Sequence, residues 1–239
     1  AGAGDATVAV GGLVAVGESK MDGCKNYGNV TYTAGASYGA LVGGLAGYND
    51  GAMNKCENHG NVTMSVESLS AYGVVKSIDN LPIHIGGLAA QLGANAPVTE
   101  SVNRGTVDYD ITKVENLAVS CGPNRPRMGG IVGLTQSSIT SSTNEGIVDV
   151  NVVTSDSSIF SGKNYPINVG GISGGSGSVT YCKNTGTIDG HLSIVDGNIG
   201  GIIGWLDKGH KFEYNESYCT LSNTRAPGTK GTSEVGGLI

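Results

Sequence analysis

Apolar and polar residues alternate in five short segments of the chain, each of which follows an Asn-x-Gly motif. The alternating positions that we expect to point inward are Val30/Tyr32/Ala34, Val62/Met64/Val66, Val107/Tyr109/Ile111, Val148/Val150/Val152 and Ile188/Gly190/Leu192. The residues between them are mostly Thr, Ser, Asn and Asp. A period of two with β-branched residues predicts β-strands that bury one face and expose the other to water.

A second pattern is a pair of glycines that returns seven times, at intervals of 32, 43, 43, 41, 30 and 36 residues. The pairs are Gly11-Gly12, Gly43-Gly44, Gly86-Gly87, Gly129-Gly130, Gly170-Gly171, Gly200-Gly201 and Gly236-Gly237. Apolar residues flank the pairs at an odd spacing, as Val42 and Leu45 do, so a flat strand cannot keep both on one face. Because glycine lacks a Cβ atom and readily adopts a positive φ, we expect each pair to form a corner that turns both neighbours inward.

Repetition at this period is typical of solenoids and propellers. A propeller blade needs four antiparallel strands, whereas only about three strand signals are visible in each repeat. The predicted fold is therefore all-β: a right-handed parallel β-helix of about six coils, with residues 1–239 as one domain. The hand follows from the preference for right-handed crossovers between parallel strands.

The Asn-x-Gly motif predicts a second corner in each coil. A buried asparagine amide can bond to local backbone and to the same residue one coil away. We therefore expect an asparagine ladder along the stack, made of Asn26, Asn58, Asn103, Asn144 and Asn184.

The three long repeats carry their extra residues at one place, after the alternating segment, at 67–82, 112–127 and 153–166. Insertions at one repeat position must leave the stack on one side, and loops grouped on a rigid scaffold are common sites of recognition. The chain starts close to one diglycine and stops just after another, without a capping segment. We therefore expect it to be a fragment of a larger surface protein.

Three of the five cysteines, Cys24, Cys56 and Cys182, occupy a repeat position that is Ser101 and Ser142 in other coils. Interchange with serine predicts a small buried slot that holds a free thiol. A disulfide between Cys24 and Cys56 in neighbouring coils is the alternative. The chain has no Cys-x-x-Cys pair and no regular histidine spacing, so zinc is not expected.

The formal net charge of −6 and the scattered basic residues argue against nucleic acid or an anionic membrane surface as a partner. No apolar run approaches 18 residues, so no membrane insertion is expected. Low charge with abundant Gly, Asn, Thr and Ser favours an extracellular or cell-surface location. No motif predicts a cofactor.

The segments Gly-Gly-Leu-Ala-Gly at 43–47, Gly-Gly-Ile-Val-Gly at 129–133 and Gly-Gly-Ile-Ile-Gly at 200–204 resemble the GLUG motif of bacterial surface and secreted repeat proteins. Ala15 and Ala90 replace the last glycine in two repeats, and Ser173 replaces the hydrophobic residue in another. The resemblance implies a bacterial cell-surface or secreted protein. It does not imply peptidase activity, because the His-Glu-x-x-His signature of the metallopeptidases that carry such repeats is missing.

One row of acidic residues keeps an enzymatic alternative open. Five residues after successive repeat asparagines lie Asp108, Asp149 and Asp189, which should form a column on the outer face of the stack. Such a column suits three interpretations: a solvated face, a site for calcium or another cation, and a carbohydrate-active site that uses carboxylates as acid and base.

A row of aromatic residues is the other candidate site. Tyr48 and Trp205 share the position five residues after the first glycine of a pair, and Tyr214 and Tyr218 follow close to Trp205. These rings are candidates for binding a sugar, and the alternative is that they pad a corner of the coil. The predicted function is a non-catalytic, adhesive spacer and interaction module. Its expected partners are an unidentified glycan or protein of a host or neighbouring cell and adjacent domains of the parent chain.

Overall fold

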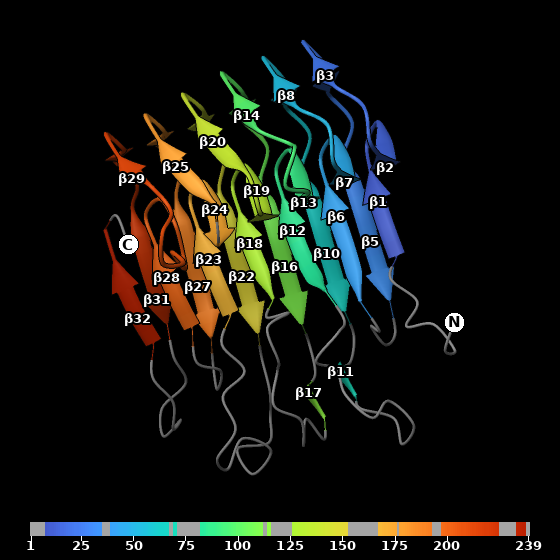
Figure 1. Cartoon of the computed structure of the whole chain (residues 1–239). Coiled ribbons are helices and arrows are strands. Elements are labelled where there is room, and N and C mark those ends of the chain that lie inside the picture. Colours follow the sequence, from blue (N-terminus) through green and yellow to red (C-terminus); the bar gives the residue numbers. More distant parts are fainter. Residues whose placement is uncertain are drawn as a thin grey trace.

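The computed structural model describes residues 8–34, 39–66, 69–70, 82–111, 114–115, 126–152, 167–175, 177–192, 197–224 and 233–237. These residues form a parallel β-helix, with successive coils stacked from the N-terminal to the C-terminal end (Figure 1). All the named strand pairs are parallel and in register, with equivalent repeat residues opposite each other. The predicted all-β solenoid of about six coils is confirmed. Within the described ranges, the chain has no helix with the length and apolar character to cross a membrane.

The first five coils each contribute one strand to five sheets, here called A to E in chain order, and the sixth coil meets sheet B only through a single bridge at Ile203. Sheet A is β1 (Val8–Gly11), β6 (Ala40–Gly43), β12 (Ile83–Gly86), β18 (Arg127–Gly129), β23 (Ile167–Gly170), β28 (Gly197–Gly200) and β32 (Ser233–Gly236). Sheet E is β5 (Val30–Ala34), β10 (Val62–Val66), β16 (Val107–Ile111), β22 (Val148–Val152), β27 (Ile188–Leu192) and β31 (Leu221–Thr224). Sheet E holds the alternating segments that the sequence predicts as strands.

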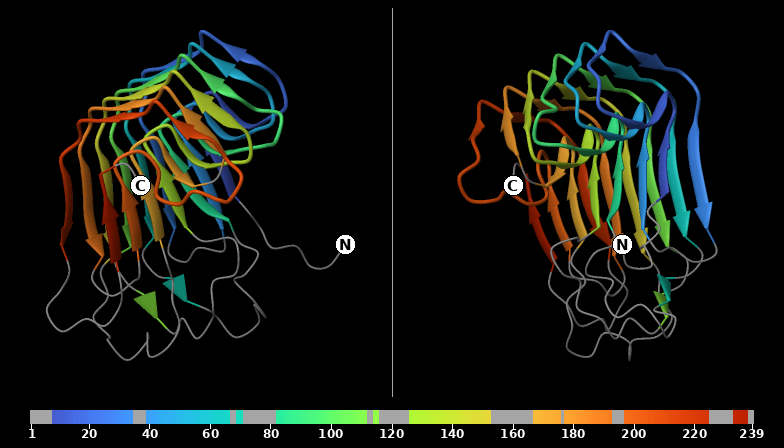
Figure 2. Two further views of the ribbon diagram at one scale, coloured as in Figure 1. Left: turned by 60° about the vertical axis from the view of Figure 1, so that its left-hand side comes forward. Right: turned by 45° about the vertical axis from the view of Figure 1, so that its right-hand side comes forward.

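Shorter strands connect sheet A to sheet E and form a curl at one end of the long strands (Figure 2). Sheet B is β2 (Val14–Gly17), β7 (Ala46–Asn49), β13 (Ala89–Leu92), β19 (Val132–Thr135) and β24 (Ser173–Gly175). Sheet C is β3 (Met21–Asp22), β8 (Met53–Asn54), β14 (Val98–Thr99), β20 (Ser138–Thr140), β25 (Ser178–Thr180) and β29 (Phe212–Glu213). Sheet D is β4 (Lys25–Asn26), β9 (Glu57–Asn58), β15 (Val102–Asn103), β21 (Thr143–Asn144), β26 (Lys183–Asn184) and β30 (Glu216–Ser217).

The interior consists of two apolar clusters rather than one. The first lies between sheets A and E and includes Val42 and Val62. The second lies between sheet B and the C–D side of the coil and includes Leu45 and Met53. The diglycine corner therefore sends its two apolar neighbours into different clusters, which explains their odd spacing. The prediction that both neighbours turn inward is confirmed, since Val42 and Leu45 are both fully buried, although in separate clusters.

The diglycines are required by close packing and not by a positive φ. The described glycines with positive φ are Gly23, Gly39, Gly177 and Gly209, and none belongs to a pair. A Cβ atom on Gly44 would overlap the carbonyl oxygen of Gly87 in the next coil and the side chain of Asn58. The predicted corner is confirmed, but its physical reason is that the two corners of each coil touch inside the stack.

The asparagine ladder is confirmed. Each side-chain amide donates to the next coil, with Nδ2···Oδ1 distances of 2.9 Å for Asn26–Asn58, 2.9 Å for Asn58–Asn103, 2.8 Å for Asn103–Asn144 and 2.9 Å for Asn144–Asn184. The same Nδ2 atoms also donate to the carbonyl of the motif glycine, as Asn103 does to Gly105 at 2.8 Å. Four of the five asparagines in the row lie between coils on both sides, which leaves their amides no access to water.

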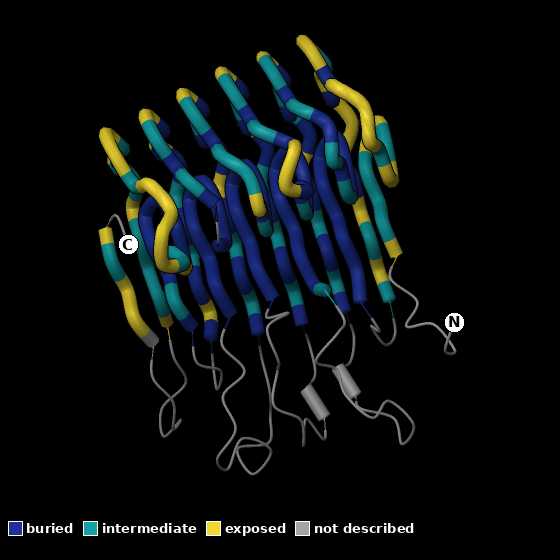
Figure 3. Tube along the Cα trace, viewed as in Figure 1, coloured by how far each residue is buried: buried dark blue, intermediate teal, exposed yellow. Residues whose placement is uncertain are grey.

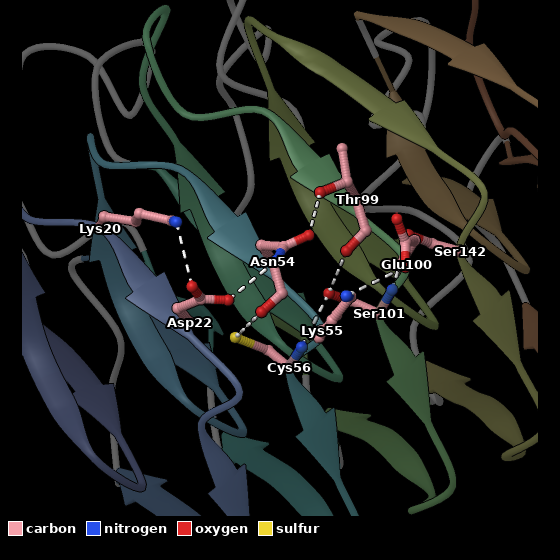
Figure 4. Close-up of polar contacts among 9 residues, drawn as sticks. All are labelled: Lys20, Asp22, Asn54, Lys55, Cys56, Thr99, Glu100, Ser101 and Ser142. Carbon is pink, nitrogen blue, oxygen red and sulfur yellow. Dashed lines mark hydrogen bonds and ion pairs between the residues drawn. The ribbon is translucent and has the colours of Figure 1, made fainter.

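The predicted buried slot is confirmed at Cys56 and Cys182, whereas Cys24 in the first coil is only half-buried. Figure 4 shows the hydrogen bonds around Cys56 and Ser101. Cys56 Sγ donates to the carbonyl of Asn54 at 3.4 Å, and Ser101 Oγ donates to that of Thr99 at 2.8 Å in the next coil. The four described cysteines, Cys24, Cys56, Cys182 and Cys219, are free thiols. Desolvation raises the pKa of Cys182 to about 11, so this thiol is protonated and unreactive at neutral pH.

The central strands of sheet A, β6, β12, β18 and β23, are buried on both faces (Figure 3). The second face of the sheet carries His84 and Arg127 side by side in register. Desolvation and the neighbouring Arg127 charge lower the pKa of His84 to about 3, so this imidazole is neutral at physiological pH.

The predicted insertions lie largely outside the described residues. The last residues of β10, β16 and β22 are Val66, Ile111 and Val152, and they are aligned at the C-terminal ends of these strands in sheet E. The insertions therefore start from neighbouring points. Within them, β11 (Leu69–Ser70) and β17 (Val114–Glu115) form a parallel pair.

Candidate interaction surface at the corner between sheets C and D

Sheets C and D meet at a corner whose central residue has a left-handed backbone in every coil. These residues are Gly23, Lys55, Glu100, Ser141, Tyr181 and Tyr214, with φ between 49° and 62°. A left-handed conformation costs a non-glycine residue about 1 to 2 kcal/mol, and it is an outlier for a bulky side chain. Only the first coil avoids this cost by using glycine.

Two of the strained residues are tyrosines in successive coils. The rings of Tyr181 and Tyr214 stack with centroids 4.8 Å apart and an interplanar angle of 12°. Tyr181 nevertheless keeps 58% of its surface exposed, and Tyr214 keeps 72%. Exposed positions also gather at the corner ends of the coils in Figure 3. A strained backbone that presents two large rings to water points to function, because folding alone favours glycine here.

A third tyrosine extends this surface. Tyr218 is 66% exposed, and Lys183 Nζ lies 4.7 Å from its ring centroid. The same ammonium lies 3.6 Å from Glu216. Together Tyr181, Tyr214 and Tyr218 form what we call the tyrosine surface of the last two coils.

The predicted aromatic site is only partly assembled. Tyr48 lies in the expected column with Val16, Gln91 and Leu134. The bridge between Ser173 and Ile203 places Trp205 at the end of the same column. Tyr48 and Trp205 are thus four coils apart, roughly 19 Å at ordinary strand spacing, and do not share a binding surface.

Trp205 has surroundings of its own. It donates from Nε1 to Asp207 at 2.7 Å and borders a hollow of about 250 Å³. Tyr214 and Tyr218 instead contact the preceding coil through Tyr181 and Lys183. Sequence reasoning missed Tyr181, although it precedes Cys182 at the same repeat position that Tyr214 has before Asn215.

The first coils carry an ion-pair network on the same outer side. Glu57 contacts Lys25 Nζ at 2.7 Å, Arg104 Nη1 at 2.7 Å and His59 Nε2 at 2.9 Å. Hydrogen bonds from Lys25 and His59 lower the pKa of Glu57 to about 2. Tyr27 stacks on His59 with ring centroids 4.6 Å apart. Since each charge is matched in the next coil, we interpret this network as support for the register of the coils.

The acidic column is confirmed on the outer face of sheet E. Asp108, Asp149 and Asp189 are paired in register, and Ser222 follows them and donates to Asp189. Desolvation, and then the neighbouring carboxylates, raises the pKa of both Asp108 and Asp149. Asp149 Oδ1 is buried and has no hydrogen-bond partner among the described residues.

The three carboxylates form a row and not a compact ligand set. In the part of the chain that the structure describes, no group of three or more His, Cys, Asp and Glu side chains is arranged to hold a metal ion. Carboxylates one strand apart, at about 5 Å, repel by about 0.8 kcal/mol in water and about 3 kcal/mol at an effective dielectric constant of 20. The row therefore opposes folding when it is ionised.

Replacement of Asp149 by asparagine is expected to raise the melting temperature at pH 7. A pKa raised by folding means that the ionised group costs stability above that pKa, and that the cost disappears as pH falls towards the unfolded value of 3.8. The gain in the free energy of unfolding, about 1 kcal/mol, should therefore vanish near pH 3. Thermal melts at the two pH values measure it. Asp189→Asn, at the end of the row beside Ser222, should gain less, and a destabilised Asp149→Asn protein would contradict the repulsion argument.

Comparison of the chain with models of protein families, with curated proteins and with solved structures finds no match. Inference about function therefore depends on the geometry described above.

Proposed function

We propose that this chain is a non-catalytic spacer and interaction module of a bacterial cell-surface or secreted protein, and that its role is adhesive. The observation that supports this proposal is the tyrosine surface, where Tyr181 and Tyr214 are exposed in strained corners. Tyrosine supplies large contact area at low conformational-entropy cost, which suits recognition of another molecule. The proposed partners are a glycan or protein on a host or neighbouring cell, and adjacent domains of the parent chain.

The spacer role is supported by the stacked architecture. Five intervals between six coils span about 24 Å at ordinary strand spacing. Buried amide ladders and two continuous apolar clusters join each coil to its neighbours. Such a rod would hold the tyrosine surface at a fixed distance from whatever precedes it. The resemblance to GLUG repeats supports the surface location.

The test is binding of the fluorescently labelled chain to a glycan array and to immobilised host cells. The double variant Tyr181→Ser/Tyr214→Ser is expected to lose at least about tenfold in affinity, which corresponds to about 1.4 kcal/mol. Tyr27→Ser removes an equally exposed stacked tyrosine at the other end of the rod and should bind normally. Binding that survives the double variant would contradict the proposal.

A second candidate function is a carbohydrate-active or calcium-binding module that uses Asp108, Asp149 and Asp189. It is favoured by the unpaired Asp149 Oδ1. We expect millimolar Ca²⁺ to leave the melting temperature unchanged and a polysaccharide cleavage screen to show no product. A calcium-dependent rise, or cleavage, that Asp149→Asn abolishes would establish this candidate instead.

A further inference from the structure

One residue in the row of corner residues is much smaller than its neighbours, and we call the space above it the step. Ser141, in the fourth coil, is small and exposed, whereas its neighbours are the long Glu100 in the third coil and the ring of Tyr181 in the fifth. Register places the three corners in line, because Val98, Ile139 and Val179 pair directly, as do Val102, Thr143 and Lys183. Tyr214 covers one face of the Tyr181 ring. The opposite face is therefore turned towards the space above Ser141.

The size of this step selects a single ring. The corners of the third and fifth coils are two strand spacings apart, about 9.4 to 9.8 Å. A flat ring in contact on both sides needs about 3.5 to 4.0 Å on each side, or about 7 to 8 Å in total. One ring therefore fits between Tyr181 and Glu100 above Ser141, and two stacked rings do not. An occupant here would continue the stack that Tyr214 and Tyr181 begin.

The groups around the step indicate which ring is bound. The face of a tyrosine ring carries partial negative charge, so it attracts the polarised C–H groups on the flat face of a sugar. Glu100 forms an ion pair with Lys55 at 3.8 Å. The side chains of Lys55 and Glu100 are 64% and 60% exposed. Such a pair contributes little, about 0 to 1 kcal/mol, so the carboxylate can readily accept a hydrogen bond from a ligand hydroxyl. The Ser141 hydroxyl can donate or accept at the floor.

We infer that the step formed by Glu100, Ser141 and Tyr181 is a binding subsite for one pyranose ring with a face of axial C–H groups, as in a β-glucoside. This inference rests on the proposed interaction function and names its ligand class. Tyr181 is the stacking wall, Ser141 the floor and Glu100 the hydroxyl acceptor. Tyr214 supports the Tyr181 ring from behind.

The decisive variant is Ser141→Tyr, which fills the step with a third ring. The fold should accept it, because tyrosine already occupies this left-handed corner in the two following coils. The probe is methyl β-D-glucopyranoside, followed through the ring signals of ¹³C-labelled tyrosine by nuclear magnetic resonance. We expect saturable shifts of the Tyr181 signals with a Kd in the range of about 1 to 100 mM, as expected for one sugar.

Ser141→Tyr should abolish the shifts of the Tyr181 signals, while Ser141→Gly, which leaves the step open, should keep them. Melting temperatures of all variants establish that they are folded. Absence of any Tyr181 shift at about 100 mM probe, or a response that survives Ser141→Tyr, would overturn the subsite. If N-acetyltyrosinamide binds and the glucoside does not, the ligand class is wrong, but the interaction function stands. If the chain binds neither probe and no cell or glycan, both proposals fail.

Discussion

Replacement of Gly130 by alanine is expected to destabilise the fold by about 3 kcal/mol or more. The new methyl carbon would lie 2.6 Å from Nδ2 of Asn144 and would also overlap the carbonyl oxygen of Gly171 in the next coil. One obstacle is backbone and the other is a buried side chain fixed by hydrogen bonds, so neither can yield without moving a coil. Chemical denaturation measures this loss in the free energy of unfolding. The expected loss is a large fraction of the stability of an ordinary domain.

The matched control is Gly237→Ala, at the same repeat position in the last diglycine. No described atom lies within 4 Å of a Cβ atom built there, so this variant should be close to the original protein in stability. Equal effects of the two substitutions would show that glycine is needed for backbone freedom and not for contact between the two corners.

Replacement of Asn103 by alanine is expected to cost about 3 to 5 kcal/mol. Asn103 donates to Gly105 and to Asn144 and accepts from Asn58, and it is fully buried. Its loss leaves the carbonyl of Gly105 and the amide oxygen of Asn144 without these donors, and each buried unsatisfied group costs about 1 to 3 kcal/mol. The free energy of unfolding from urea titration is the measurement.

The control is the same substitution at an exposed asparagine, Asn29→Ala. Asn29 Oδ1 accepts one bond, from the backbone amide of Asn61 at 2.9 Å. Water can replace that bond at the surface, so the expected cost is about 1 kcal/mol or less. A comparable loss at both positions would mean that the buried ladder has no special role in holding the coils together.

The sequence predicted the repeat-level features well. The alternation around Val62 identified the strands of sheet E, and the spacing of the asparagines identified a ladder that the structure confirms. The acidic column at Asp149 also followed from counting, because in-register stacking turns equal repeat positions into neighbours in space. The short strands of sheets B to D were less visible, since two-residue strands are too short for a period to be detected.

The candidate site was less predictable. Grouping Trp205 with Tyr214 relied on closeness in sequence, whereas in a solenoid the neighbours of Tyr214 are the residues of the adjacent coil, above all Tyr181. A positive φ at the C–D corner has no single sequence signature, because Lys55, Glu100 and Ser141 adopt it as well. The left-handed corner that carries Tyr181 could therefore not be inferred from residue type.

The sequence by itself determined that the chain is a parallel stack and which residues form rows along it, because the same motifs recur in successive repeats and fix the register. Only the tertiary structure decided how each coil closes. The path of a coil depends on contacts between its corners, such as that of Gly44 with Asn58, and on the division of Val42 and Leu45 between two apolar clusters. Those contacts join residues within one coil, where no repeat relates them, so the sequence pattern carries no record of them.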